Sequence, residues 1–323
     1  MIRTAVRCLV ALAVLLVGGP ALAQTGYPTR AIKFVVPFPG GGINDVLARI
    51  VGDKLSAKWA QPVVVENRTG AGGNIGAEAA AQAEPDGYTI LVAPPGPLAI
   101  NRSLYKHLSY DSTAFVPITL IGSVPNLVIV RKELPVSSVK ELIEYIKQNC
   151  GKVNFGSQGS GATPHLTAEM FMNMTGTRMT HVPYRGETLV LNDLMGGHVD
   201  VFFGNISAAL ALYRAGKVKV LAVTDKARAA AMPEVPTMAE AGLPGLVSVG
   251  WFAMAGPPGM KTDIRDQIAG AANEALKLPD VQEKFRAVGV EPMGGGPATM
   301  AAFVKEENQR WGEVIRKNNI AMD

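Results

Sequence analysis

Two glycine-rich segments of the chain combine the residue types that bind an anion through the backbone. They are residues 39–45 (PGGGIND) and residues 156–163 (GSQGSGAT), and each lies between an apolar run and a helical pattern. Glycine lets the main chain come close to a ligand, and the free N–H groups of a helix's first turn attract negative charge. We therefore expect two anion-binding turns, with Asn44 and Thr163 at helix N-caps and Asp45 stabilising the first helix end.

Serine hydrolysis is the enzymatic alternative for the second segment. An α/β hydrolase holds its serine in a G-x-S-x-G turn, and neither Ser157 nor Ser160 has glycine both two residues before and two residues after it. The four histidines show no spacing typical of a catalytic triad or a metal pair: His107, His165, His181 and His198. We expect no catalytic residue, no metal site and no enzyme, and keep an exported serine hydrolase using Ser157 or Ser160 as the alternative.

A third glycine-rich segment, residues 70–76 (GAGGNIG), is similar to the dinucleotide-binding fingerprint G-x-G-x-x-G. Its last glycine falls one residue too late, and four polar residues separate the segment from the preceding apolar run. We interpret it as a glycine-rich turn before a helix. No nucleotide and no other cofactor is expected.

The first 23 residues have the pattern of a secretory signal peptide. Arg3 and Arg7 precede an unbroken apolar run over residues 8–17, which Gly18-Gly19-Pro20 ends, and Ala21-Leu22-Ala23 supplies the small residues that a signal peptidase reads. A membrane anchor is the alternative, but a spanning helix needs about 20 apolar residues. We expect export and cleavage after Ala23.

Composition and charge restrict the class of protein further. The 323 residues are 48% hydrophobic and 18% charged with 2 cysteines, which excludes a disordered chain and a disulfide scaffold. The net charge is +4, and Arg3 and Arg7 of the leader supply half of it. A nearly neutral chain without a basic run is a poor nucleic-acid binder, so no nucleic-acid partner is expected.

Short apolar runs alternate with helical periodicity from Tyr27 onward, which predicts an α/β fold with mostly parallel strands. Ser138 followed by Glu141 predicts a capping box at a helix start. Two final helices are expected over residues 261–277 and 298–317. The candidate strands are residues 32–38, 63–66, 89–93, 127–130, 153–155, 199–203 and 218–223.

The length predicts two domains at about 150 residues per domain. Two apolar stretches that contain or end in proline, around residues 121–130 and 247–258, are interpreted as crossovers between them. We therefore expect a second domain over residues 127–249, inserted into a first domain of residues 24–126 plus 250–323. The two glycine-rich turns then lie one in each domain, where a carboxylate between them would bridge the domains and hold them closed.

Five ordered motifs resemble the substrate-binding proteins of tripartite tricarboxylate transporters, the Bug receptors. The resemblance runs from about Tyr27 to the end of the chain. The motifs are residues 37–45 (PFPGGGIND), 156–166 (GSQGSGATPHL), 182–186 (VPYRG), 216–224 (GKVKVLAVT) and 233–242 (PEVPTMAEAG). It implies a two-lobed type II periplasmic binding protein fold with the ligand in the interdomain cleft, closing about a hinge.

The resemblance also implies a function and a site. A periplasmic monomer would capture a small organic acid, a mono- or dicarboxylate with aromatic ones included, and deliver it to the membrane permease subunits. Backbone N–H groups, small hydroxyls and water would hold the carboxylate. The candidate ligand-binding residues are Phe38, Gly40, Gly41, Gly42, Asn44, Asp45, Ser157, Gly159, Gly161, Ala162, Thr163, His165, Tyr184, Arg185, Gly186, Gly204 and Asn205.

Four positions depart from the family pattern: proline is common at Gly40, serine or threonine at Asn44, a small residue at Glu187 and aspartate at Gly204. Losing an acid at 204 makes room for a bulkier or second anionic group. Glu187 is interpreted as a solvated loop charge, the alternative being a group that repels an anion or accepts a donor. Arg185 is either a partner for a distal carboxylate or a surface cation.

Overall fold

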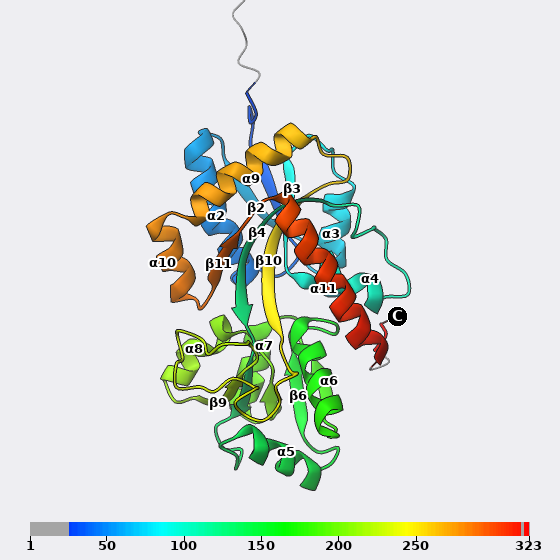
Figure 1. Ribbon diagram of the computed structural model, residues 1–323, viewed down its shortest axis with the longest axis vertical. Helices are drawn as coiled ribbons and strands as arrows, with labels where there is room; N and C mark the ends of the chain where they lie inside the picture. The colour runs from blue at the N-terminus through cyan, green and yellow to red at the C-terminus, as the bar shows by residue number, and fades with distance from the viewer. Residues whose placement is uncertain (1–25, 318–319, 323) are drawn as a thin grey trace, which may run out of the picture.

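The computed structural model describes residues 26–317 and 320–322, so the predicted signal peptide over residues 1–23 lies entirely outside the described part. Two lobes, each built on its own sheet, are stacked along the long axis of the molecule (Figure 1). Among the described residues, no helix is long and apolar enough to cross a membrane.

The sheet of the first lobe has the strand order β11-β4-β10-β3-β1-β2. The β2-β1-β3 part is parallel, and β10 joins it antiparallel to β3. The inner strands β1, β3 and β10 are covered on both faces, which explains their nearly continuous apolar sequences. Their bounds are β1 Ile32–Val36, β2 Val63–Asn67, β3 Thr89–Ala93, β4 Val116–Pro125, β10 Val249–Gly256 and β11 Glu291–Gly294.

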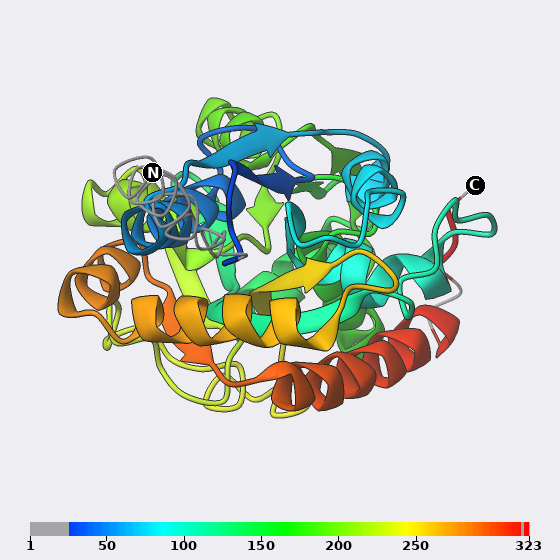
Figure 2. The same ribbon diagram turned by 90° about the horizontal axis from the view of Figure 1, so that it is seen from above.

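Helices cover both faces of the first sheet (Figure 2). Phe34 and Val36 of β1 pack with the apolar faces of α2 and α9, whereas Val35 points the other way, toward α3 and α11. This alternation is the two-residue period of a strand. The helices are α2 Ile43–Trp59, η1 Ala71–Gly73, α3 Asn74–Ala81, η2 Gly96–Ile100, α4 Asn101–Leu104, α9 Thr262–Leu276, α10 Pro279–Ala287 and α11 Pro297–Lys317.

The second lobe repeats this arrangement on a smaller scale, with strand order β7-β6-β8-β5-β9. Phe155 and Val201 pack with α5 and α6 on one face, while Phe202 packs with α7 and α8 on the other. The elements are β5 Leu127–Arg131, α5 Val139–Gln148, β6 Asn154–Ser157, α6 Thr163–Thr175, β7 Thr180–Pro183, α7 Glu187–Gly196, β8 Val201–Phe202, α8 Ile206–Arg214 and β9 Val218–Val223.

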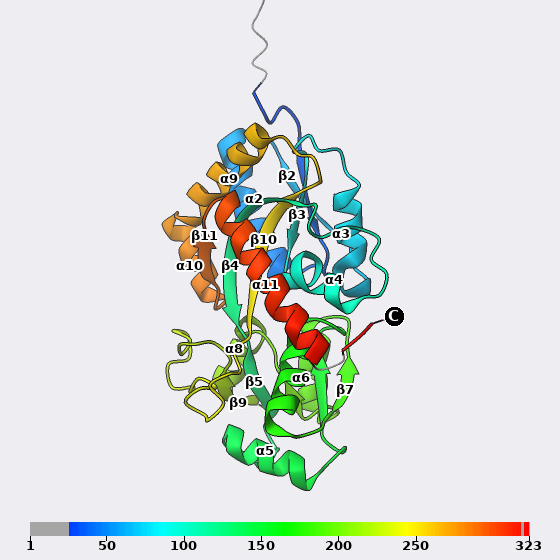
Figure 3. The same ribbon diagram turned by 45° about the vertical axis from the view of Figure 1, so that its right-hand side comes forward.

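Two crossings join the lobes, and they lie side by side. β4 runs toward the second lobe, β10 returns from it, and the two strands pair antiparallel (Figures 1 and 3). Only Asn126 separates β4 from β5. Asn126 is fully buried, and its Nδ2 donates to Ser248 Oγ at 3.2 Å, just before β10. Ser248 Oγ also lies 2.6 Å from Thr167 Oγ1 of α6. These hydrogen bonds tie both crossings to the second lobe at one place.

Most sequence expectations agree with these elements. Every candidate strand overlaps a strand, and the two final helices are α9 and α11. β7 and β11 were not predicted, and β4 and β10 overlap the stretches that were interpreted as crossovers. The expectation of mostly parallel strands is wrong, because β10, β4 and β11 in the first sheet and β8, β5 and β9 in the second pair antiparallel. Ser138 caps α5 by accepting from the backbone N–H of Glu141, whose carboxylate accepts from Ser137 N. The change of sheet falls at Asn126 and before β10, which is compatible with the predicted domain boundaries.

The N-cap predictions for Asn44 and Thr163 are wrong. The N-cap residues of α2 and α6 are Gly42 and Ala162, so Asn44 lies in the first turn of its helix and Thr163 is the first residue of the other. Gly42 and Ala162 have extended backbones and no side chain that caps. The sequence rule favours a polar N-cap residue, and here small residues occupy that position.

Candidate functional site: the cleft between the lobes

A cavity of about 720 Å³ lies between the two lobes. From the first lobe, residues 38–44, the Pro94-Pro95 turn after β3 and strand β10 line it. From the second lobe, Gln158, Thr163 and the starts of α7 and α8 line it. Both predicted glycine-rich turns therefore reach this cavity, each at the carboxyl end of a strand, where open α/β sheets bind ligands.

Four helices begin at the cavity: α2, α6, α7 and α8. None of these four has a side-chain hydrogen bond capping its N-terminus, and their N-cap residues are Gly42, Ala162, Gly186 and Asn205. The first N–H groups of a helix have no partner within the helix, and the helix dipole adds partial positive charge there. One such end from the first lobe (α2) and three from the second (α6, α7 and α8) make the cavity a site for negative charge.

Asp45 stabilises the first loop by hydrogen bonds and lies outside the cavity lining. Its carboxylate accepts from the Gly41 backbone N–H at 3.0 Å, from Asn67 Nδ2 at 3.1 Å and from both Arg49 donors. Burial would raise the pKa of Asp45, but the hydrogen bonds from Arg49, Gly41 and Asn67 outweigh it and hold that pKa below its usual range. Gly41 has a φ of +81°, which only glycine adopts easily.

Asn44 lines the cavity and holds a buried acceptor. Its Nδ2 donates to the Val92 carbonyl of β3 at 3.0 Å, which fixes the orientation of the amide. The other end of the amide, Oδ1, is buried and has no hydrogen-bond partner among the described residues. A buried carbonyl oxygen without a partner costs about 1–3 kcal/mol.

Stacked rings support the second loop. The rings of His165 and His181 lie 4.0 Å apart, and Phe155 stacks on His181 at 4.8 Å. His181 Nε2 lies 2.7 Å from Ser157 Oγ, and His165 Nδ1 accepts from the Gly161 N–H at 3.0 Å. Burial, with the charge of His165, lowers the pKa of His181 to about 3, so this ring stays neutral near pH 7.

Gly161 faces the first lobe instead of the cavity. A Cβ at Gly161 would collide with Leu104 Cδ2 of α4, and the φ of Gly161 is +79°. Leu104 packs there with Leu166 of α6 and with Trp311 of α11. The second loop is thus also a contact between the lobes, on the side of the molecule where α11 reaches α6 (Figure 3).

Glu187 and Asn205 form the wall of the cavity in the second lobe. Asn205 Nδ2 donates to Glu187 Oε1 at 2.5 Å, and both residues line the cavity. Burial raises the pKa of Glu187 to about 7, against hydrogen bonds from Asn205 that lower it. The interpretation of Glu187 as a solvated loop charge is therefore wrong. Asn205 is 4% exposed, and its Oδ1 is buried without a partner among the described residues.

Nine of the seventeen candidate residues line this cavity, and eight do not. Tyr184 donates its hydroxyl to Asp193 Oδ2 at 2.6 Å, away from the cavity, and the ring of Phe202 fills the space that a side chain at Gly204 would need. The residues in the lining are Phe38, Gly40, Gly41, Gly42, Asn44, Thr163, Arg185, Gly186 and Asn205. Those outside it are Asp45, Ser157, Gly159, Gly161, Ala162, His165, Tyr184 and Gly204.

Several lining residues were not predicted from the sequence. The Pro94-Pro95 turn directly follows strand β3, and the rule for carboxyl ends of parallel strands would have found it. Leu189 and Met195 of α7 are 49% and 40% exposed, so the cavity has an apolar surface that is open to water. Trp251 of β10 forms the back of the cavity, and its Nε1 donates to Glu307 at 2.8 Å.

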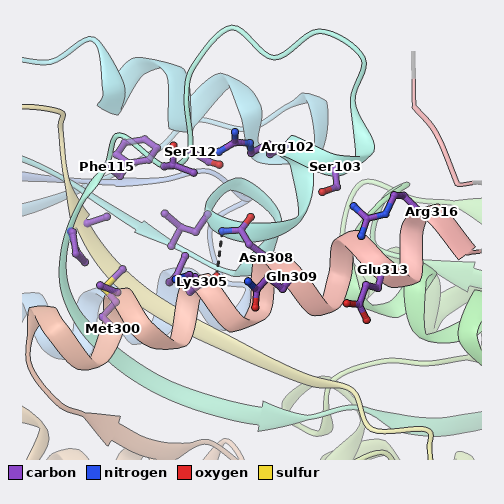
Figure 4. A pocket seen from close by; sticks show the side chains of 16 residues that line it. Arg102, Ser103, Ser112, Phe115, Met300, Lys305, Asn308, Gln309, Glu313 and Arg316 are labelled. Atoms are coloured by element: carbon purple, nitrogen blue, oxygen red, sulfur yellow. Dashed lines mark hydrogen bonds between the residues drawn. The ribbon is translucent and has the colours of Figure 1, made fainter.

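A second cavity, of about 750 Å³, lies on the outer side of the first lobe between α11 and the segment before β4 (Figure 4). Its lining, which includes Arg102, Phe115 and Lys305, comes entirely from the first lobe, so movement between the lobes would not enclose it. The cleft is the cavity that both lobes share. No group of three or more His, Cys, Asp or Glu side chains suited to a metal ion occurs in residues 26–317 and 320–322.

Comparison with known proteins places this geometry in context. A family model described as "Tripartite tricarboxylate transporter family receptor" matches residues 47–320. Protein BugT of Bordetella pertussis is 38% identical over 303 residues, covering 93% of each chain.

Solved structures agree with these matches. Rpa4515 of Rhodopseudomonas palustris, solved with adipate, is 39% identical with a TM-score of 0.88 and covers 92% of this chain and 99% of its own. MatC of the same organism, solved with malate, is 31% identical with a TM-score of 0.84, covering 90% and 100%. The periplasmic binding protein BugD is 34% identical with a TM-score of 0.85, covering 92% and 100%. The prediction of a two-lobed periplasmic binding protein fold is confirmed.

Proposed function

Because the chain belongs to the tripartite tricarboxylate transporter receptor family, as its five motifs predicted, we propose that it captures a small organic carboxylate by closing its two lobes. Members of this family are solute-binding receptors, and relatives were solved with adipate and with malate. The ligand of this chain is a mono- or dicarboxylate that fits the 720 Å³ cavity, aromatic ones included. The closed protein delivers it to the membrane permease subunits, and the chain itself catalyses no reaction.

The observation that carries this proposal is the convergence of four uncapped helix N-termini on one cavity. Of the described residues that line the cavity, only Arg185 and Glu187 are ionisable. Backbone N–H groups therefore supply most of the positive potential, and they do so without the desolvation cost of a buried cation. A carboxylate is the small anion that a near-neutral chain with this lining binds best.

Closure follows from where the N–H groups lie. α2 belongs to the first lobe and α6 to the second, so a carboxylate between Ile43 and Thr163 contacts both lobes only when they approach each other. A ligand shifts a conformational equilibrium by its difference in affinity for the two states. The paired crossings at Asn126 and Ser248 are the hinge, and closure covers the exposed side chains of Leu189 and Met195.

The export of the receptor belongs to the same proposal. The leader is removed after Ala23, and the mature protein is a monomer in the periplasm, the compartment where a receptor meets solutes before they cross the inner membrane. The proposed receptor needs no cofactor and no nucleic-acid partner.

Thermal unfolding against a panel of mono-, di- and aromatic carboxylates tests the proposal. A ligand that binds only the folded protein stabilises it by about 2.7 kcal/mol at 100 times its dissociation constant, so a true ligand raises the melting temperature further as the logarithm of its concentration increases. Mass spectrometry of small molecules retained by gently purified protein then identifies the natural ligand. A panel without any stabilising carboxylate would contradict the proposal.

A further inference from the structure

We propose that the bound carboxylate carries, at its other end, a hydrogen-bond donor that reaches the wall formed by Glu187 and Asn205. The donor is a hydroxyl or an ammonium group. This inference rests on the proposed function and adds to it the chemical class of the ligand's distal group.

The hydrogen bond between Asn205 and Glu187 decides what this wall offers. Asn205 Nδ2 donates one of its two N–H groups to Glu187 Oε1 at 2.5 Å, which holds the carboxylate in place. Asn205 Oδ1 is buried and has no partner among the described residues. Glu187 lines the cavity, and its carboxylate accepts hydrogen bonds when ionised. The Glu187 carboxylate is therefore the acceptor that this wall presents to the cavity.

The first lobe repeats this pattern across the cavity. Asn44 donates its Nδ2 to Val92 O, which leaves its Oδ1 as a second buried acceptor without a partner among the described residues. Asn44 and Asn205 are each 4% exposed, so water reaches neither side chain freely. Both amide oxygens are covered in this structure, so Glu187, which lines the cavity, is the acceptor that a distal donor meets.

The charge of Glu187 argues against a second carboxylate at this wall. A distal carboxylate would contact the anionic Glu187 side chain, and this contact is repulsive. Arg185 also lines the cavity and is the alternative partner for such a group, but its side chain is exposed and hydrated. The favourable ligand is thus a carboxylate with a hydroxyl or ammonium group at the other end.

Isothermal titration with ligands of equal length tests this. Two series are used: butanoate, 4-hydroxybutanoate, 4-aminobutanoate and succinate, and then hexanoate, 6-hydroxyhexanoate, 6-aminohexanoate and adipate. At pH 8 we expect one of the two donor-bearing compounds in at least one series to bind at least tenfold more tightly than the alkanoate and the diacid of that series. The inference is overturned if, in every series that shows binding, the alkanoate or the diacid binds as tightly as the hydroxy acid and the amino acid of that series.

Variants identify the residue and separate the two donors. Glu187→Gln removes the charge of the side chain but keeps its shape. If the donor is an ammonium group, the affinity of this variant for the amino acid falls at least tenfold, while its affinity for the hydroxy acid changes less. If it is a hydroxyl, Glu187→Gln changes its affinity less than fivefold, and Asn205→Leu abolishes the preference for it. The control is Glu144→Gln on α5, an exposed glutamate outside the cavity, which changes no affinity. A donor preference that survives both Glu187→Gln and Asn205→Leu contradicts the assignment of the wall.

The two proposals fail in different ways. If no compound of either series binds and the broader carboxylate panel also gives no ligand, the proposed function fails and this inference fails with it. If diacids or alkanoates bind with the affinity of the donors, the receptor function stands and only the distal donor is excluded.

Discussion

Ser157 Oγ lies 2.7 Å from His181 Nε2, the distance of a serine–histidine pair in a hydrolase. The environment of the pair is not that of a nucleophile. Ser157 is 0% exposed and does not line the cleft, and its hydroxyl also contacts the Gly159 carbonyl at 3.0 Å. The low pKa of His181, about 3, makes this ring a weak base. The pair holds the second loop in place.

Replacing this serine tests the hydrolase alternative. We expect wild-type protein and Ser157→Ala to be equally inactive on a panel of esters, because no substrate reaches a buried hydroxyl. The variant loses roughly 1–3 kcal/mol of unfolding free energy, since His181 Nε2 loses its partner. Ser160→Ala, at the second candidate serine of the same loop, is the control for stability. Hydrolysis that disappears with either serine would contradict the receptor function.

The backbone of the first loop can be tested at Gly41. Valine there is strained because φ is +81°, and the displaced loop no longer presents its N–H groups to the ligand. We expect Gly41→Val to reduce carboxylate affinity at least 100-fold in a titration, with a folded protein by circular dichroism. Gly197→Val is the matched control, since Gly197 has a φ of +77° and also has open space around its Cβ position, but lies outside the cavity. Equal losses of affinity in both variants would refute a specific role of the first loop.

The sequence predicted the parts of the fold that depend on local patterns. Nearly continuous apolar runs such as residues 127–130 (LVIV) identified the buried strands, because strands covered on both faces need apolar residues at successive positions. β11 (EPMG) has no such pattern and becomes a strand only because it pairs with the edge of β4. β4 contains Pro117 and Pro125, and proline in a sequence argues against an inner strand because it has no N–H to donate. A ten-residue strand nevertheless forms there, paired with β10 and β11.

The candidate site divides in the same way. Glycine loops are local signals, so Gly40 to Gly42 and Thr163 could be placed at the cavity from the sequence. Whether a side chain of such a loop faces the ligand depends on tertiary contacts: Leu104 of the first lobe occupies the space beside Gly161. Glu187 accepts a hydrogen bond from Asn205, 18 residues further along the chain, and no spacing rule indicates that contact.

The contact between Gly161 and Leu104 predicts a cost for a single methyl group. In Gly161→Ala, the Cβ collides with the leucine side chain, so α4 and the second loop must separate. Gly176→Ala is the matched control, because Gly176 at the end of α6 has a φ of +64° and open space around it. We expect Gly161→Ala to lower the melting temperature by several degrees more than Gly176→Ala, beyond the roughly 1–2 kcal/mol that a left-handed backbone costs alanine. Equal melting temperatures would show that the two lobes are not in contact at this point in solution.

The pKa of Glu187 predicts how stability depends on pH. The folded protein binds a proton at Glu187 up to about pH 7, whereas an unfolded chain releases it near the ordinary glutamate value. The unfolded state therefore binds fewer protons between these two values, and the ligand-free protein loses stability through Glu187 as the pH rises across them. Arg185, the other ionisable residue of the lining, keeps its charge throughout this range.

Glu187→Gln removes this dependence, because glutamine is neutral at every pH. We expect the variant to melt about 2–4 °C above the wild type at pH 8, the shift that roughly 1 kcal/mol produces in a chain of this size, and at the same temperature as the wild type at pH 4.5. Comparing the two proteins at each pH cancels the titration of all other groups. A melting difference that is the same at both pH values would mean that Glu187 is solvated and ionises normally, and it would remove the charged wall from the cleft.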